Sequence, residues 1–305
     1  MRKLFRSSNL QAEFEKKGYV IVDFLKPEII NEIVKVYDTL TPDDKFNPGA
    51  NRYHCTFIDT NETYKKKTNE LFKQHCNGCI ENIFIDYEIL TGNFYIKQPG
   101  TGEFEVHQNW TMVDETKSTT VTIWIPLHDT NEQNGTIEVV EGSNKIVDNI
   151  NTLHLPYFFS NFEPQLKEKY LKPVSLKLGQ AIIFDDNLIH YSKNNNSDTT
   201  RKAMQLICVP KKTQLIFYYV DTNDTRYIEK YETNYAFYLK HNIIHVLNRP
   251  PLKYLGKIPN KNIILSEEEF AILLENGEEI RRKIYSIENK ISNNNWITIF
   301  HKLFR

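Results

Sequence analysis

The sequence predicts a mainly β protein, in which a sandwich or barrel carries helices packed outside it. From about residue 91 onward, short apolar and β-branched segments alternate with Gly, Asn and Pro, a cadence typical of antiparallel β folds. Before residue 91, apolar positions recur at helical spacing. The chain contains neither a Gly-rich P-loop nor a G-x-G-x-x-G motif, which argues against a nucleotide-binding α/β fold.

The N-terminal third is expected to supply helices and one strand. Residues 9–17 predict a short helix, and "GYVIVDFL" (18–25) predicts a buried strand because it is β-branched and aromatic. Residues 26–40 predict a helix, since Pro27 suits a first helical turn and the apolar residues after it keep helical spacing. A second helical stretch is expected within residues 62–90.

Eight short strands are expected in the central region, separated by turn-forming residues. Within "TTVTIWIPLHD", alternation places Thr122 and Trp124 on one face and Val121, Ile123 and Ile125 on the other. The eight segments are "GNFYIKQPG", "FEVHQNW", "TTVTIWIPLHD", "NGTIEVVEGS", "PVSLKLGQ", "AIIFDD", "LIHYS" and "RKAMQLICVP".

The C-terminal part shows a looser pattern. "LIFYY" is a further candidate strand, and "YETNYAFYLKHNII" is mixed. Residues 266–291 are mostly helical and open with Ser266 followed three positions later by Glu269, which is a capping box. The last residues, "NNNWITIFHKLFR", form a short amphipathic piece.

Composition limits the classes of function. Of the 305 residues, 40% are apolar and 25% are charged, which is globular composition, and 38 Lys and Arg nearly balance 39 Asp and Glu. Nothing therefore predicts a nucleic acid or an anionic membrane as partner. The N-terminus lacks the apolar segment of a secretory signal, and no run approaches the ~18 apolar residues of a membrane span, so we expect a cytoplasmic protein.

The cysteines favour the same compartment. Four cysteines in a chain of this size suggest reducing conditions. Cys76 and Cys79 form a single C-x-x-C without a second close pair, so free thiols are favoured over a structural zinc site.

Four features line up in order around the candidate chemistry. His107 and Asn109 stand two residues apart in "HQNW", and Asn134-Gly135 is followed by "TIEVVEGS". His190 follows in "LIHYS", and Arg201 lies eleven positions later (201 − 190 = 11). Side chains at i and i+2 of a strand share a face. A mononuclear non-haem Fe(II) site needs two imidazoles and a carboxylate on one side of the ion. An arginine on the next strand can then hold the far carboxylate of 2-oxoglutarate in a bidentate salt bridge.

Residues from about 10 to 220 resemble the phytanoyl-CoA dioxygenase family of Fe(II)/2-oxoglutarate oxygenases. The matching segments are "GYVIVDFLKPEIINEI", "YIKQPGTGEFEVHQNW", "TIWIPLHDTNEQNGTIEVVEGSNK" and "GQAIIFDDNLIHYSKNNNSDTTRKA". The resemblance implies a double-stranded β-helix core of jelly-roll or cupin-like form, with helical N-terminal and C-terminal extensions. Residues 1–212 would form the oxygenase-like domain. Residues 213–305 would form a partly helical extension that packs on the core or caps it.

The resemblance also implies a reaction and a role for each matched residue. The protein would hydroxylate a small-molecule or carrier-bound metabolite with Fe(II), O2 and 2-oxoglutarate, which is decarboxylated to succinate. His107 and His190 would bind iron, with Asn109 at the third position, and Arg201 would bind the far carboxylate of 2-oxoglutarate. The co-substrate pocket would also be lined by Lys97, Trp124, Ser192 and, in contact with either co-substrate or substrate, Gln108.

Two residues depart from the family pattern. Asn144 stands where the family usually has a His, and we interpret it as a surface-loop residue. Asn109 stands where the family has an Asp, and its amide oxygen lacks the charge of a carboxylate. Restoring Asp at position 109 is expected to raise iron affinity.

The Asn at position 109 leaves several readings open. The site can stay active with Asn109 as a weak ligand or with water in its place. It can be degenerate, in a relative that binds a ligand or a partner without turnover. In special cases the open position takes another ligand such as halide, or the chain is an altered version of an Asp-bearing enzyme.

Overall fold

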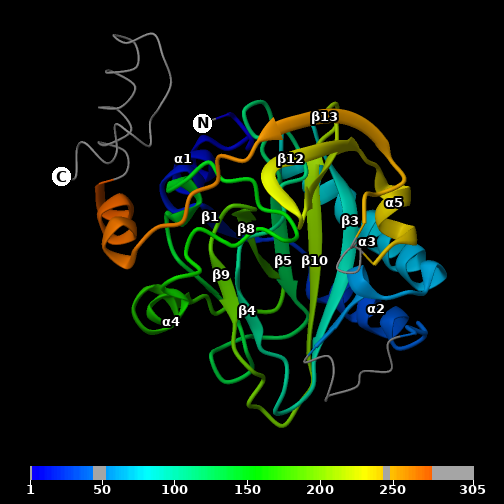
Figure 1. The fold of residues 1–305 in the computed structure, drawn as a ribbon. Coiled ribbons are helices and arrows are strands. Elements are labelled where there is room, and N and C mark those ends of the chain that lie inside the picture. Colours follow the sequence, from blue (N-terminus) through cyan, green and yellow to red (C-terminus); the bar gives the residue numbers. More distant parts are fainter. Residues whose placement is uncertain (1, 44–52, 243–247, 277–305) are drawn as a thin grey trace.

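The N-terminal helices form where their spacing predicts them. The computed structural model describes residues 2–43, 53–242 and 248–276 (Figure 1). Helix α1 (Ser8–Lys17) begins where the Ser7 side chain accepts a hydrogen bond from the Leu10 backbone N–H. It ends at Gly18, whose φ of 81° is readily adopted by glycine. Helix α2 (Pro27–Tyr37) has Pro in its first turn, as the sequence predicts.

The third helix lies within residues 62–90, where the sequence predicts a helical stretch. Helix α3 (Glu62–Ile83) starts at an Asn61 cap, and the chain then turns through Asp86, whose φ is 56°. The helix expected within residues 62–90 is thus confirmed. Strand β3 (Tyr87–Lys97) follows the turn and pairs along its length with a distant strand.

Six antiparallel strands make the larger sheet, in the order β1-β8-β5-β10-β3-β2. Helices α1, α2 and α3 cover its outer face, where residues such as Phe14, Ile33 and Phe72 pack against Ile123 and Leu206. The alternation predicted for residues 121–125 is confirmed, since Ile123 packs with the helices and Trp124 does not. The strands not yet given are β1 (Tyr19–Asp23), β2 (His54–Cys55), β5 (Val121–Pro126), β8 (Gln180–Asp185) and β10 (Arg201–Pro210).

A second sheet closes the barrel. It has the order β4-β9-β6-β7, with strands Phe104–His107, His190–Ser192, Ile137–Val139 and Lys172–Pro173 respectively. Ile137 and Val139 of this sheet share one apolar cluster with Trp124, Phe184 and Ala203 of the larger sheet. The two sheets therefore face each other across an apolar interior, and the fold is the predicted double-stranded β-helix with flanking helices.

The C-terminal part adds a three-stranded sheet, β11 (Ile216–Asp221), β12 (Asp224–Glu232) and β13 (Lys253–Pro259), which crosses one end of the barrel in Figure 1. "LIFYY" is thus a strand. The mixed segment contains the last two residues of β12 and helix α5 (Tyr235–Lys240), and its last two residues lie outside the described part of the chain. The other short elements are η1 (Thr56–Ile58), η2 (Ser143–Lys145), α4 (Glu163–Gln165) and η3 (Leu166–Tyr170).

The last described helix covers residues 267–276. Its predicted capping box is confirmed, because the Ser266 N–H donates to the Glu269 carboxylate at 2.8 Å and the Glu269 N–H donates to the Ser266 hydroxyl at 3.2 Å. The remainder of the helix predicted to residue 291, and the C-terminal amphipathic piece, lie outside the described residues.

The four cysteines are free thiols, and Cys76 and Cys79 lie on α3. Among the described helices, none is long and apolar enough to cross a lipid bilayer.

Candidate active site

The two predicted histidines lie side by side at the mouth of the barrel. His107 ends β4 and is paired directly with His190, the first residue of β9, so the centres of the two rings are 4.0 Å apart. Each Nδ1–H donates to a backbone carbonyl, that of Glu105 at 2.7 Å for His107 and that of Leu188 at 2.8 Å for His190. Both Nε2 lone pairs are therefore left for a metal ion.

The protonation of this pair suits metal binding. Burial lowers the pKa of His190 to about 4. Burial and the adjacent His190 also hold the pKa of His107 well below its usual value. At neutral pH both imidazoles are uncharged, which is the form that coordinates a metal.

Asn109 lies beside the pair, just beyond the end of β4. Its Nδ2 donates to the Thr122 hydroxyl and to the Asp186 carboxylate, each at 2.9 Å, and its backbone N–H donates to the Asp186 carbonyl at 2.9 Å. Within the described part of the chain, no group of three or more His, Cys, Asp and Glu side chains could hold a metal ion. A metal on the histidine pair would thus have Asn109 as its neighbouring oxygen donor.

Arg201 is the first residue of β10 and lies opposite Lys97 of β3. The side chain is only 2% exposed, yet its Nε and Nη1 have no hydrogen-bond partner. Its guanidinium lies over the Trp124 ring at 5.5 Å from the ring centre. Burial lowers the pKa of Arg201 to about 9, so it stays cationic at neutral pH. A buried cation with unused donors is suited to binding an anion.

Lys97 and Ser192 line the same cavity as Arg201. The Lys97 Nζ donates to the Ser192 hydroxyl at 2.6 Å, to the Ser192 carbonyl at 3.0 Å and to the Lys193 carbonyl at 2.7 Å. The Ser192 hydroxyl donates onward to the Gly135 carbonyl at 2.8 Å. All three hydrogen bonds of Lys97 are thus made within the protein, so this lysine offers no free donor to the pocket. Burial and the adjacent Arg201 hold the pKa of Lys97 well below its usual value.

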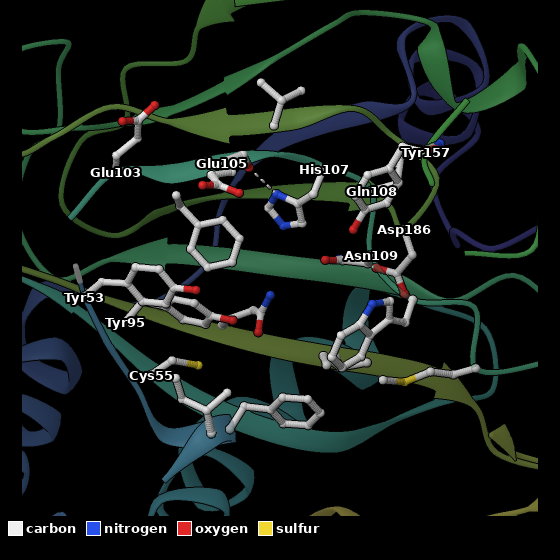
Figure 2. Close-up of a pocket in the computed structure, with 18 residues that line it drawn as sticks. Tyr53, Cys55, Tyr95, Glu103, Glu105, His107, Gln108, Asn109, Tyr157 and Asp186 are labelled. Atoms are coloured by element: carbon white, nitrogen blue, oxygen red, sulfur yellow. Dashed lines mark hydrogen bonds between the residues drawn. The ribbon is translucent and has the colours of Figure 1, made fainter. Parts of the chain in front are cut away.

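Two cavities meet at His107. The smaller has a volume of about 50 Å³ and is lined by Lys97, Trp124, His190, Ser192 and Arg201 among others. The larger has a volume of about 500 Å³ and is rich in aromatic side chains, namely Tyr53, Phe57, Tyr95, Phe104, Trp110 and Tyr157. Figure 2 shows His107, Gln108, Asn109 and Asp186 on one side of it and Tyr53 and Tyr95 on another.

The structure separates Gln108 from the rest of the predicted co-substrate set. Gln108 lines the large cavity and not the small one, its Nε2 donates to the Asn187 carbonyl, and its buried Oε1 has no partner. Lys97, Trp124, Ser192 and Arg201 line the small cavity together.

The interpretation of Asn144 as a surface-loop residue is wrong. Asn144 is 8% exposed, and its Nδ2 donates to the buried Asp185 carboxylate at 3.0 Å. It is buried because the η2 turn folds against Gly18 at the start of β1.

Sequence reasoning missed three residues of the site. Tyr95 and Gln205 line both cavities. Strand alternation from Lys97 and Arg201 places both on the same faces as those residues, so this signal was available. Asp186 gave no such signal, because it lies in the turn after β8 and touches Asn109 only through the folding of the barrel.

A double-stranded β-helix with two paired imidazoles and a buried arginine at one end is typical of the metal- and 2-oxo-acid-binding oxygenase class. A family model described as Phytanoyl-CoA dioxygenase (PhyH) matches residues 14–203. The chain belongs to this family.

Two curated relatives carry the same description. The "Phytanoyl-CoA dioxygenase domain-containing protein 1 homolog" of Dictyostelium discoideum is 26% identical over 144 residues, which are 44% of this chain and 51% of the relative. "Phytanoyl-CoA dioxygenase 1" of Oryza sativa subsp. japonica is 29% identical over 126 residues, 39% of this chain and 43% of the relative. The chain thus spans about half the length of the curated relatives it matches.

Solved structures with a similar fold are more distant. The non-heme alpha ketoglutarate dependent carbocyclase SnoK from nogalamycin biosynthesis matches with a TM-score of 0.49 at 15% identity, covering 68% of this chain and 86% of SnoK. EctD from S. alaskensis, solved with 2-oxoglutarate and 5-hydroxyectoine, also matches with 0.49, at 18% identity over 68% of this chain and 78% of EctD. Identities this low do not identify a substrate.

Proposed function

We propose that the protein is an Fe(II)/2-oxoglutarate-dependent oxygenase that hydroxylates a small-molecule or carrier-bound metabolite. The buried Arg201 carries this proposal, because its Nε and Nη1 have no partner in a small cavity that also contains His190. Leaving a buried guanidinium without an anion is costly, so the arrangement favours a carboxylate ligand at this position. Membership of the phytanoyl-CoA dioxygenase family supports the same cofactors.

Each site residue receives a role in this proposal. His107 and His190 hold the iron with Asn109, and Arg201 binds the far carboxylate of 2-oxoglutarate. Bound iron supplies O2 activation coupled to decarboxylation of 2-oxoglutarate to succinate and CO2. Trp124 supports the guanidinium by its ring face. Lys97 and Ser192, joined by a hydrogen bond, line the same cavity beside Arg201.

The large cavity is the proposed substrate site. It opens beside His107 and Asn109, and its aromatic walls suit a substrate with an apolar or planar part. Met112 and Ile207 line this cavity and also pack in one apolar cluster with Phe217 of β11 and Tyr238 of α5. We propose accordingly that the described part of residues 213–305 extends the β-helix domain of residues 1–212 and supports the wall of its substrate site.

Asn109 favours a second candidate function. A relative without turnover, natural or altered from an Asp-bearing enzyme, would bind 2-oxoglutarate or another ligand in the same cavity. Anaerobic reconstitution with Fe(II) separates the two functions. The oxygenase gives a visible absorbance that depends on both Fe(II) and 2-oxoglutarate, and it forms succinate after O2 is admitted. The impaired relative binds 2-oxoglutarate in calorimetry but forms no succinate with any substrate.

An arginine variant tests the anchor itself. Arg201→Gln is expected to weaken 2-oxoglutarate binding by about 100-fold or more, since truncating one partner of a buried charge pair costs on the order of 3 kcal/mol or more. The exposed Arg226, which pairs with Asp224 on β12, provides a matched control as Arg226→Gln. Equal 2-oxoglutarate affinity in wild type and Arg201→Gln would show that the anion is held elsewhere.

A further inference from the structure

Asp186 is a buried carboxylate to which the proposed function assigns no role. It is 2% exposed and lies in the turn between β8 and β9, at the rim of the large cavity. Its Oδ1 accepts hydrogen bonds from Asn109 Nδ2 at 2.9 Å and from the Thr122 hydroxyl at 2.7 Å. Asn109 and Asp186 are also joined through the backbone, where the Asn109 N–H donates to the Asp186 carbonyl at 2.9 Å.

These contacts fix which end of the Asn109 amide faces the protein. An ionised carboxylate can only accept hydrogen bonds, and the Thr122 hydroxyl already donates its proton to Asp186. The amide nitrogen of Asn109 must therefore face both groups, and its oxygen points away from them. Within the described residues no hydrogen bond reaches the Asn109 Oδ1. Figure 2 shows Asn109 lying between His107 and Asp186.

We propose that Asp186 is a positioning residue for the metal site. It holds Asn109 so that the amide oxygen points toward His107 and His190. Its carboxylate also supplies, on the far side of the Asn109 amide, the negative charge that Asn109 itself lacks. This inference rests on the proposed function, because it needs a metal at the histidine pair. Asp186 acts through Asn109 and not as a ligand, since no third acidic or imidazole side chain of the described chain is placed to share a metal with the pair.

The charges support this assignment. Fe(II) with two neutral imidazoles, a neutral amide and the 2-oxoglutarate dianion totals zero, whereas a carboxylate at position 109 would give −1. Adding the Asp186 carboxylate to the buried site returns the total to −1. A carboxylate that binds the nitrogen of an amide also increases the electron density on its oxygen, which improves that oxygen as a donor. Removing such outer partners of metal ligands typically costs about 10–100-fold in metal affinity.

Mn(II) affinity measures this role without turnover. Free Mn(II) is followed by its paramagnetic resonance signal during titration of the full chain, with and without saturating 2-oxoglutarate. Asp186→Asn is expected to weaken Mn(II) binding by about 10-fold or more. Asp185→Asn is the matched control, because Asp185 is the neighbouring buried carboxylate but bonds to Asn144 and the Asn187 N–H and does not touch Asn109. Its Mn(II) affinity should equal that of the wild type, and thermal melts establish that each variant is folded.

An exchange of the two side chains gives the sharper test. Asn109→Asp alone would place two carboxylate oxygens at the present 2.9 Å separation, so like-charge repulsion should offset the benefit of an anionic ligand. Combining Asn109→Asp with Asp186→Asn restores one carboxylate and one amide across the same contact. The exchange variant should bind Mn(II) at least as tightly as the wild type and more tightly than either single variant.

Each contrary outcome has a distinct meaning. Asp186→Asn binding within about twofold of the wild type would overturn the positioning role while leaving the oxygenase proposal standing. Asn109→Asp binding as tightly as the exchange variant would overturn it as well. If Asn109→Ala kept full Mn(II) affinity, Asn109 would not contribute to metal binding, which contradicts the inference. A wild type that binds no Mn(II) with 2-oxoglutarate would overturn both proposals together.

Discussion

Asp185→Asn should change how folding stability depends on pH. Asp185 is buried at the end of β8, and burial raises its pKa from the ordinary 3.8 to about 6 in the folded protein. A carboxyl with a raised folded pKa contributes stability that is fully present below about pH 4 and is lost as the pH rises through about 6. The difference of about two pH units corresponds to about 3 kcal/mol. Relative to the wild type, the permanently neutral Asn variant should gain about this much between pH 4 and pH 7.

The measurement is urea unfolding of both proteins across this range. The amide is tolerated because its oxygen can still accept from the Asn187 N–H, and the Asn144 side chain can turn its unpartnered Oδ1 toward the new NH2 group. Asp114→Asn is the control, since hydrogen bonds from Thr116 and Lys117 lower the pKa of that half-exposed carboxyl. Its contribution is lost only as the pH falls below about 4, so the stability difference between wild type and Asp114→Asn should stay nearly constant from pH 4 to pH 7. A stability difference between wild type and Asp185→Asn that stays constant from pH 4 to pH 7 would refute the reasoning.

Two further predictions concern the anion pocket. Trp124→Leu removes the ring that lies 5.5 Å from the Arg201 guanidinium. This variant should bind 2-oxoglutarate about 3–30-fold more weakly in calorimetry. Unchanged affinity would mean that the ring contributes only packing. Gly102→Ala should lower the free energy of unfolding in urea by about 1–3 kcal/mol. Gly102 has a φ of 96°, and an added Cβ would lie 2.6 Å from Lys97 Cγ. An unchanged free energy of unfolding would show that the Lys97 side chain can move aside.

Much of the fold follows from local patterns. The period-2 alternation of residues 121–125 correctly assigns the two faces of β5, and the Ser266 capping box correctly places the start of the last described helix. The helix expected within residues 62–90 is confirmed as α3. The pairing of β3 with β10 could not be predicted, because no local signal reports a partner more than a hundred residues away. Asn144 was misjudged for the same reason, since its burial comes from contacts with Gly18 and Asp185.

Some residues of the candidate site could be predicted from the sequence, and Asp186 could not. Spacing and family motifs locate His107, His190 and Arg201, because each lies at a strand end whose register the motif carries. Asp186 could not be found from the sequence, since its contact with Asn109 depends on how the turn after β8 folds back onto the end of β4.

This contact changes what an Asn at position 109 means. From the sequence, Asp→Asn removes one negative charge from the site, and restoring Asp should simply raise metal affinity. In the folded protein a carboxylate already lies one amide away from that position, where at an effective dielectric constant of about 20 a unit charge still contributes a few kcal/mol to a nearby cation. The site therefore lacks an anionic ligand atom, but it keeps the electrostatic attraction of the nearby Asp186 carboxylate for a cation. Restoring Asp alone would then crowd two carboxylates, so iron affinity should rise only when Asp186 is neutralised in the same protein.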